Sequence, residues 1–162
     1  MRILDFNTII LDLDYTVWYG CKDKFWAKKL VSPIKTKQNM IIDKNGDFIT
    51  LYEGVEYFLK YLTKHNKNIG YITRGGFDMT PVSQQPPVEC LFYFGISEYF
   101  KFNNVVTSMN YKKSQFFRNN GNTLYIDDNE NELIDIKNNF PDVVTLNRNQ
   151  FKNWKDLQWI EI

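Results

Sequence analysis

The sequence predicts an α/β fold in which a parallel sheet is covered by helices on both faces. Two short, almost continuously apolar runs, residues 8–13 and 123–126, are typical of strands that are buried on both sides. Strand-like runs alternate with helix-like runs along most of the chain, which is the order found in parallel sheets. The chain has 162 residues, of which 43% are hydrophobic, so we expect a single domain spanning residues 1–162.

The first half of the chain begins with the buried strand and continues into an irregular segment at residues 17–40. Apolar runs at residues 40–42 and 48–51 then flank a turn with Asn45 and Gly46, the strongest short signal for a β-hairpin. We therefore expect a small insertion at about residues 17–52. An amphipathic helix should follow at residues 53–65, because its apolar residues recur at the spacing i, i+3, i+4, i+7.

The second half continues the alternation of strands and helices. A strand is expected at residues 68–73, a proline-rich loop at 80–87, a short helix at 88–94 and a strand at 104–107. Residues 111–119 are predicted as a helix that ends before Gly121. The buried strand 123–126, a helix at 129–140, a strand at 143–146 and a helical tail at 149–157 complete the expected fold.

Composition excludes several classes of function. The net charge of +1 gives no general reason to bind nucleic acid or an anionic membrane. The single histidine, His65, rules out a site with several histidine ligands, and Cys21 and Cys90 have no metal-ligand or disulfide spacing. No apolar run approaches the ~20 residues of a membrane span. An acid at position 5 does not suit a secretory signal, so we expect a cytoplasmic protein.

Three predicted strands end in residues that carry chemistry. The first ends in Asp12 and Asp14, the second in Thr73, and the strand at 123–126 in Asp127 and Asp128. In a parallel sheet the carboxyl ends of the strands share one edge, so these side chains should gather there. Crowded carboxylates repel one another unless a cation lies between them, and oxygen-only ligands favour Mg²⁺ over zinc.

The spacing of Asp12 and Asp14 suggests two different roles. Residues i and i+2 of an extended segment point to the same side, so both carboxylates can reach one substrate. One of them, ionised, can attack phosphorus, while the other can protonate the leaving oxygen.

These residues resemble a known family. The run Asp12-Leu13-Asp14-Tyr15-Thr16 is similar to the DxDxT motif of haloacid dehalogenase superfamily phosphotransferases, closest to the magnesium-dependent phosphatase branch. Similar second and fourth motifs occur at residues 72–74 and 124–128. The resemblance implies a Rossmann-like three-layer sandwich with a small β-hairpin insertion instead of a large cap.

The resemblance also implies roles for individual residues. Asp12 would form an aspartyl-phosphate, and Asp14 would act as general acid and base and bind the metal through its backbone carbonyl. Asp127 and Asp128 would complete a Mg²⁺ site. Thr73 would bind the phosphoryl group. For Arg74 two interpretations stay open, contact with the substrate phosphate or exposure to solvent. The family's motif lysine has two candidates, Lys112 and Lys113, of which we favour Lys112.

The predicted activity is a Mg²⁺-dependent phosphomonoesterase acting on a phosphorylated small molecule or a phosphoprotein. One alternative is a nucleic-acid 3′-phosphatase, because a lysine-rich stretch suits contact with a phosphate backbone. Its lysines are Lys22, Lys24, Lys28, Lys29, Lys35 and Lys37. We favour a solvated insertion for that stretch. The other alternative is a catalytically silent binding protein, against which the intact acids argue.

Overall fold

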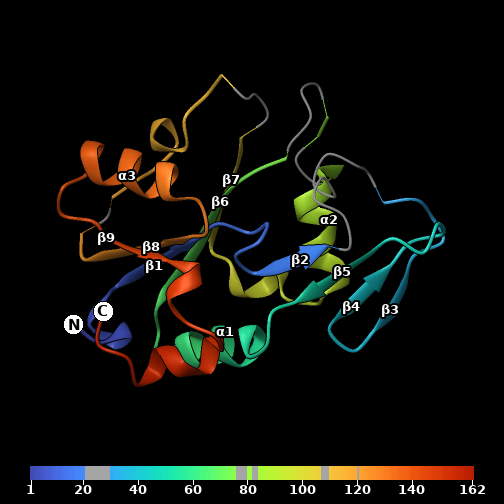
Figure 1. Cartoon of the computed structure of the whole chain (residues 1–162), viewed down its shortest axis with the longest axis horizontal. Coiled ribbons are helices and arrows are strands. Elements are labelled where there is room, and N and C mark those ends of the chain that lie inside the picture. Colours follow the sequence, from blue (N-terminus) through green and yellow to red (C-terminus); the bar gives the residue numbers. More distant parts are fainter. Residues whose placement is uncertain (21–29, 76–79, 82–83, 107–109, 120) are drawn as a thin grey trace.

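The computed structural model describes residues 1–20, 30–75, 80–81, 84–106, 110–119 and 121–162. Its centre is a five-stranded sheet in the order β7-β6-β1-β8-β9, in which every neighbouring pair is parallel (Figure 1). The strands are β1 (Thr8–Leu11), β6 (Asn68–Arg74), β7 (Phe102–Val106), β8 (Thr123–Asp127) and β9 (Val144–Asn147). The predicted parallel sheet is therefore confirmed.

Helices lie on both faces of this sheet, which gives three layers (Figure 1). Side chains alternate between the faces of a strand. Ile9 and Leu11 of β1 accordingly pack in one core with α1 (Val55–Lys64), α2 (Pro86–Tyr93) and a 3₁₀ turn, η7 (Trp154–Gln158). Ile10 points to the other face, where it joins a second core with α3 (Glu130–Asn139).

The strand order places a natural binding crevice at the centre of the sheet. From β1 the chain adds β6 and β7 on one side and then returns to add β8 and β9 on the other. Where the order reverses, at β1 and β8, the two connections leave on opposite faces and a crevice opens at the carboxyl ends of the strands. The acidic ends of β1 and β8 both lie at that crevice.

The insertion is more regular than its sequence indicates. The predicted hairpin is present as β4 (Met40–Ile42) and β5 (Phe48–Leu51), with Ile41 opposite Ile49. It belongs to a four-stranded antiparallel sheet, β2-β5-β4-β3, with β2 (Trp18–Gly20) and β3 (Lys35–Lys37) at its edges. The expectation of irregular structure at residues 17–40 is therefore wrong at both strands, while 21–29 lie outside the described residues.

One predicted helix is wrong. Residues 111–119 contain only a 3₁₀ turn, η5 (Lys113–Gln115), instead of a continuous helix. Serine, phenylalanine and asparagine are weak helix formers, so local preference is small here. Tertiary contacts therefore determine the conformation of this segment. The ring of Phe117 packs edge-on against that of Tyr125, with ring centroids 5.6 Å apart, and Lys113 is almost fully buried.

Other elements differ from expectation mainly at their ends. The C-terminal tail forms 3₁₀ turns, η6 (Arg148–Gln150) and η7, rather than an α-helix. Two further 3₁₀ turns are η1 (Ile3–Asp5) and η4 (Ser97–Tyr99). Among the described residues, no helix is both long and apolar enough for a membrane span.

Candidate active site

Strand alternation brings the first two carboxylates together. Asp12 continues the ladder of β1, since its amide donates to the carbonyl of Ile126 at 2.9 Å. Its side chain should thus point to the same face as that of Ile10, and Asp127 to the same face as Tyr125. Ile10 and Tyr125 both belong to the core beneath α3. The two aspartates therefore meet on the α3 face, where 4% of Asp12 and none of Asp127 is exposed.

A buried ammonium group joins these two aspartates. Lys113 Nζ lies 2.6 Å from Asp12 Oδ1 and 2.7 Å from Asp127 Oδ2. Only 3% of Lys113 is exposed, so both ion pairs are shielded from water. Burial by itself lowers the pKa of Lys113, but Asp12 and Asp127 raise it overall, so this lysine stays charged. Lys113 therefore bridges the end of β1 and the end of β8.

Asp127 is held from three directions. Besides Lys113, the hydroxyl of Tyr125 donates to Oδ2, and the backbone amide of Asn129 donates to Oδ1 at 2.8 Å. Burial, followed by the nearby carboxylates, raises the pKa of Tyr125 well above its usual range. Its hydroxyl consequently remains protonated and acts as a donor.

Asp14 is oriented by an aromatic side chain of the insertion. Trp18 Nε1 donates to Asp14 Oδ1 at 2.9 Å, and the indole ring stacks on Phe94 with ring centroids 5.8 Å apart. Burial raises the pKa of Asp14 to about 6, although the hydrogen bond from Trp18 lowers it. A carboxyl group with such a pKa can exchange a proton near neutral pH, as a general acid and base must.

Asp128 exchanges hydrogen bonds with Thr16, the last residue of the DxDxT run. Thr16 Oγ1 donates to Asp128 Oδ1 at 3.4 Å and accepts from the backbone amide of Asp128 at 3.1 Å. These bonds join the turn after β1 to the turn after β8. Desolvation, and after it the charge of Asp127, raises the pKa of Asp128.

The donor set fits a hard divalent cation. Asp12, Asp127 and Asp128 each offer one carboxylate oxygen, and these oxygens lie within 4.8 Å of one another. With Asp14 the site holds four carboxylates, whereas Lys113 supplies one positive charge. Burial, and next the neighbouring carboxylates Asp127 and Asp14, keep the pKa of Asp12 well above its usual value despite Lys113. The four carboxylates thus outnumber the positive charge of Lys113, and a bound cation would make up the difference. Oxygen-only ligands suit Mg²⁺.

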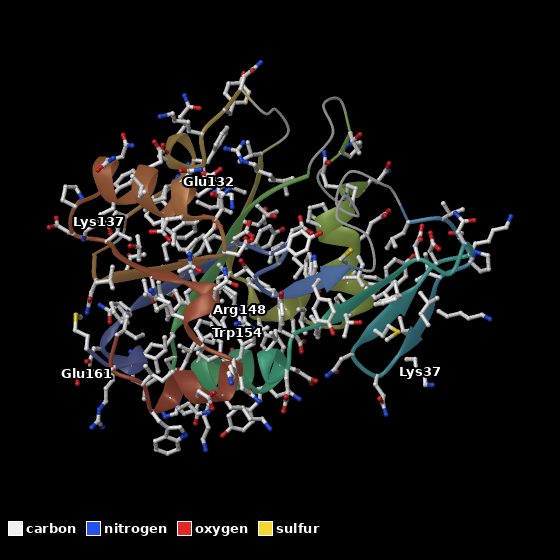
Figure 2. All side chains as sticks on the ribbon, viewed as in Figure 1. Lys37, Glu132, Lys137, Arg148, Trp154 and Glu161 are labelled. Carbon is white, nitrogen blue, oxygen red and sulfur yellow. The ribbon has the colours of Figure 1, made fainter. Side chains whose placement is uncertain are left out.

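An open cavity of 240 Å³ lies above these groups. Its wall includes an ion pair: Arg74 Nη2 is 2.7 Å from Glu132 Oε1, and its Nε donates to the same oxygen at 2.8 Å. Figure 2 shows Glu132 on α3. Arg74 also donates to the carbonyl of Tyr111 at 2.8 Å. It thereby ties the end of β6 to the segment that leads to Lys113. The lining residues are Asp12, Asp14, Tyr15, Arg74, Lys113, Asp127, Asp128, Asn129 and Glu132.

Two predicted site residues do not line the cavity. Lys112 points away from the cavity, pairs with Asp135 at 3.0 Å and has 69% of its side chain exposed. The preference for Lys112 over Lys113 therefore does not agree with their positions, because the 3₁₀ turn buries Lys113 instead. Thr73 lies at the predicted strand end and is fully buried, but its hydroxyl donates to the carbonyl of Arg74 and does not line the cavity.

Three residues of the site, Trp18, Tyr125 and Glu132, were not among the predicted site residues. Trp18 and Glu132 could have been found by spacing, since Trp18 lies four residues after Asp14 and Glu132 lies in the first turn of the helix after Asp128. Tyr125 precedes Asp127 by two residues, so both point to one face of β8. Nothing in a run of buried strand residues indicates, however, that one hydroxyl bonds an acid.

Two comparisons with known proteins find phosphatases. A family model described as acid phosphatase matches residues 6–81, a range that holds Asp12, Asp14, Thr73 and Arg74. A search of curated proteins finds no match.

Among solved structures, the chain is similar to the N-terminal part of the protein BF1531 from Bacteroides fragilis, which contains a phosphatase domain and is complexed with Mg. The two are 12% identical with a TM-score of 0.54, over 97% of this chain and 41% of that one. This likeness shows the fold, and the chain spans less than half the length of the protein it matches. The family match and the shared fold support the resemblance of this chain to haloacid dehalogenase-type phosphatases that the DxDxT motif indicates.

Proposed function

We propose that the chain is a Mg²⁺-dependent phosphomonoesterase that forms an aspartyl-phosphate on Asp12. The observation that carries this proposal is the Lys113 ammonium, which lies 2.6 Å from Asp12 and 2.7 Å from Asp127 in an acidic, buried site. Phosphoryl transfer depends mainly on positioning and on neutralising charge. Asp12, Asp127 and Asp128 would hold Mg²⁺, together with the backbone carbonyl of Asp14. When bound, this ion supplies positive charge to the phosphoryl oxygens.

The residues divide the reaction between them. An oxygen of Asp12 attacks phosphorus, and the bond from phosphorus to the leaving oxygen breaks as Asp14 delivers its proton to that oxygen. Asp14, now ionised, takes a proton from water, and the hydroxide attacks phosphorus and releases phosphate from Asp12. Lys113 favours the ionised form of Asp12 and offsets charge on the transferred group. Arg74 lines the same cavity and offers a second cation to the phosphate.

The substrate class we propose is a phosphorylated small molecule or a phosphoprotein. A nucleic-acid 3′-phosphatase receives less support. The net charge is +1, and Lys37 lies at the far edge of the second sheet, away from the central one (Figure 2). A silent binding protein would not need Asp12, Asp14, Asp127 and Asp128 to line one cavity.

Removal of divalent ions should abolish turnover. Hydrolysis of para-nitrophenyl phosphate, sugar phosphates, a phosphotyrosine peptide and a 3′-phosphorylated oligonucleotide is measured with Mg²⁺, with a chelator, and after Mg²⁺ is restored. We expect activity on at least one ester only when Mg²⁺ is present, because the carboxylates otherwise repel the anionic substrate. Full activity in the chelator would contradict the proposal.

Asp14→Asn should separate the two halves of the reaction. With a good leaving group such as nitrophenolate, the variant should still release about one equivalent of product per site in a burst. Steady turnover should fall by about 100-fold or more, because asparagine cannot take the proton from water. Alkyl phosphates, which need a proton on the leaving oxygen, should give no burst. An equal loss on both kinds of ester would rule out this role for Asp14.

A further inference from the structure

We propose that Tyr125 is a positioning residue that orients the carboxylate of Asp127 for the cation. This inference deepens the proposed function and rests on it. Its starting point is the hydrogen bond from the Tyr125 hydroxyl to Asp127 Oδ2, deep in the core and hidden from the cavity. Tyr125 would touch neither the substrate nor the metal, and would act only through Asp127.

The bonds around Asp127 define which oxygen remains available. An ionised carboxylate has about four acceptor positions. In the described part of the chain, Oδ2 accepts from both Lys113 and Tyr125, and Oδ1 accepts from the amide of Asn129. One position is left, on Oδ1, which is consistent with Asp127 offering a single oxygen alongside Asp12 and Asp128. The hydroxyl of Tyr125 thus turns Asp127 so that Oδ1 is the oxygen that faces a cation.

Tyr125 is better placed for this task than Lys113. It lies within β8, directly opposite Ile10 of β1 and Thr145 of β9, so its backbone is fixed on both sides. Its ring has no exposed surface and packs edge-on against Phe117. Lys113, by contrast, reaches the site through a long side chain from a short turn and is shared with Asp12. A rigid partner in the outer shell of a metal site is what orients a ligand.

The chain offers a matched control. Tyr71, on β6, is also a strand tyrosine with only 3% of its surface exposed, but it belongs to the core on the opposite face of the sheet. Burial alone raises its pKa, to about 12, so no charged group acts on its hydroxyl. Tyr71→Phe therefore removes the same atom from the same kind of environment without touching the site.

The test measures metal binding without substrate. Binding of Mn²⁺ to wild type, Tyr125→Phe and Tyr71→Phe is followed by the loss of the free-ion electron paramagnetic resonance signal, and Mg²⁺ affinity by competition. We expect Tyr125→Phe to weaken binding by about 10-fold or more, the usual effect of losing such an outer partner, and to raise the Mg²⁺ concentration for half-maximal activity in parallel. Tyr71→Phe should bind like the wild type.

Equal affinities for wild type and Tyr125→Phe would overturn this inference and leave the proposed function standing. A wild-type protein that binds neither ion would overturn both the inference and the proposed function.

If Tyr125→Phe does not fold, Asp127→Asn is compared with the double variant Tyr125→Phe/Asp127→Asn by chemical denaturation. A hydroxyl that acts through the carboxylate should add little once that carboxylate is gone, so similar stabilities would support the inference. A second large loss would show that Tyr125 only packs.

Discussion

Lys113→Met should reduce phosphatase turnover by about 100- to 1,000-fold, whereas Lys112→Met should leave it nearly unchanged. Lys113 is the buried cation that touches both Asp12 and Asp127, at 2.6 and 2.7 Å. Methionine has a similar length and no charge, so it keeps the packing and removes the ion pairs. Asp12 would then meet Asp127 without the intervening ammonium, would favour its protonated form, and would be a poorer nucleophile.

The same pair of variants should differ in stability. Removing one partner from a buried ion pair typically costs about 3 to 5 kcal/mol, because the remaining charges stay buried without compensation. The exposed pair of Lys112 with Asp135 should be worth about 1 kcal/mol or less. The measurements are kcat at saturating Mg²⁺ and urea denaturation of the metal-free proteins. If Lys112→Met were the more damaging change in kcat, the assignment of the motif lysine to Lys113 would be wrong.

Asp12→Asn should abolish the reaction and yet stabilise the metal-free protein. Loss of a nucleophile usually lowers kcat by roughly 10⁴- to 10⁶-fold. Burial, and then the charges of Asp127 and Asp14, raise the pKa of Asp12 well above its usual value in spite of Lys113. An acid with a higher pKa in the folded state costs stability at any pH above its unfolded pKa, since the unfolded chain ionises it more easily. A neutral asparagine removes that cost, and Lys113 keeps its second ion pair, with Asp127.

Both parts of this prediction can be measured separately. Binding of beryllofluoride, which mimics an aspartyl-phosphate, should be lost in Asp12→Asn at any Mg²⁺ concentration. Denaturation in a chelator at pH 7 should show a midpoint at or above that of the wild type, as expected where function rather than stability selects a residue. Asp127→Asn is the comparison: it should not stabilise in the same way, because Asp127 accepts three hydrogen bonds. A clear loss of stability in Asp12→Asn would contradict the charge imbalance inferred here.

The fold could be predicted from the sequence where local and global signals agree. The runs ending in Asp12 and Asp127 are almost continuously apolar because their strands are buried on both faces, and together with the alternation of strands and helices they indicate a parallel sheet. The helix at Val55–Lys64 was equally clear, since its buried residues follow one stripe. The edge strands β2 and β3 are only three residues long, and neither has the alternation of apolar and polar residues that marks a strand: β2 is Trp-Tyr-Gly and β3 is Lys-Thr-Lys.

The site could be predicted only as far as its residues lie at strand ends. Asp12, Asp14, Asp127 and Asp128 follow directly from that rule. The choice between Lys112 and Lys113 depends on which neighbour turns inward, and a helix at residues 111–119 would have placed them differently from the observed 3₁₀ turn. Tyr125 and Trp18 lie two and four residues from the aspartates to which they donate, so spacing places them nearby, but the sequence does not show that a buried aromatic side chain bonds an acid rather than only packs.

The charged edge of the second sheet bears on how the molecule behaves at high concentration. β3 is a sheet edge, and all three of its residues, Lys35, Thr36 and Lys37, are exposed. A bare strand edge can recruit another strand and begin aggregation, and lysines on that edge oppose such pairing because they cannot be desolvated cheaply. At least these two lysines of the insertion therefore have a protective use in keeping copies of the chain apart. That use does not require them to contact a nucleic acid.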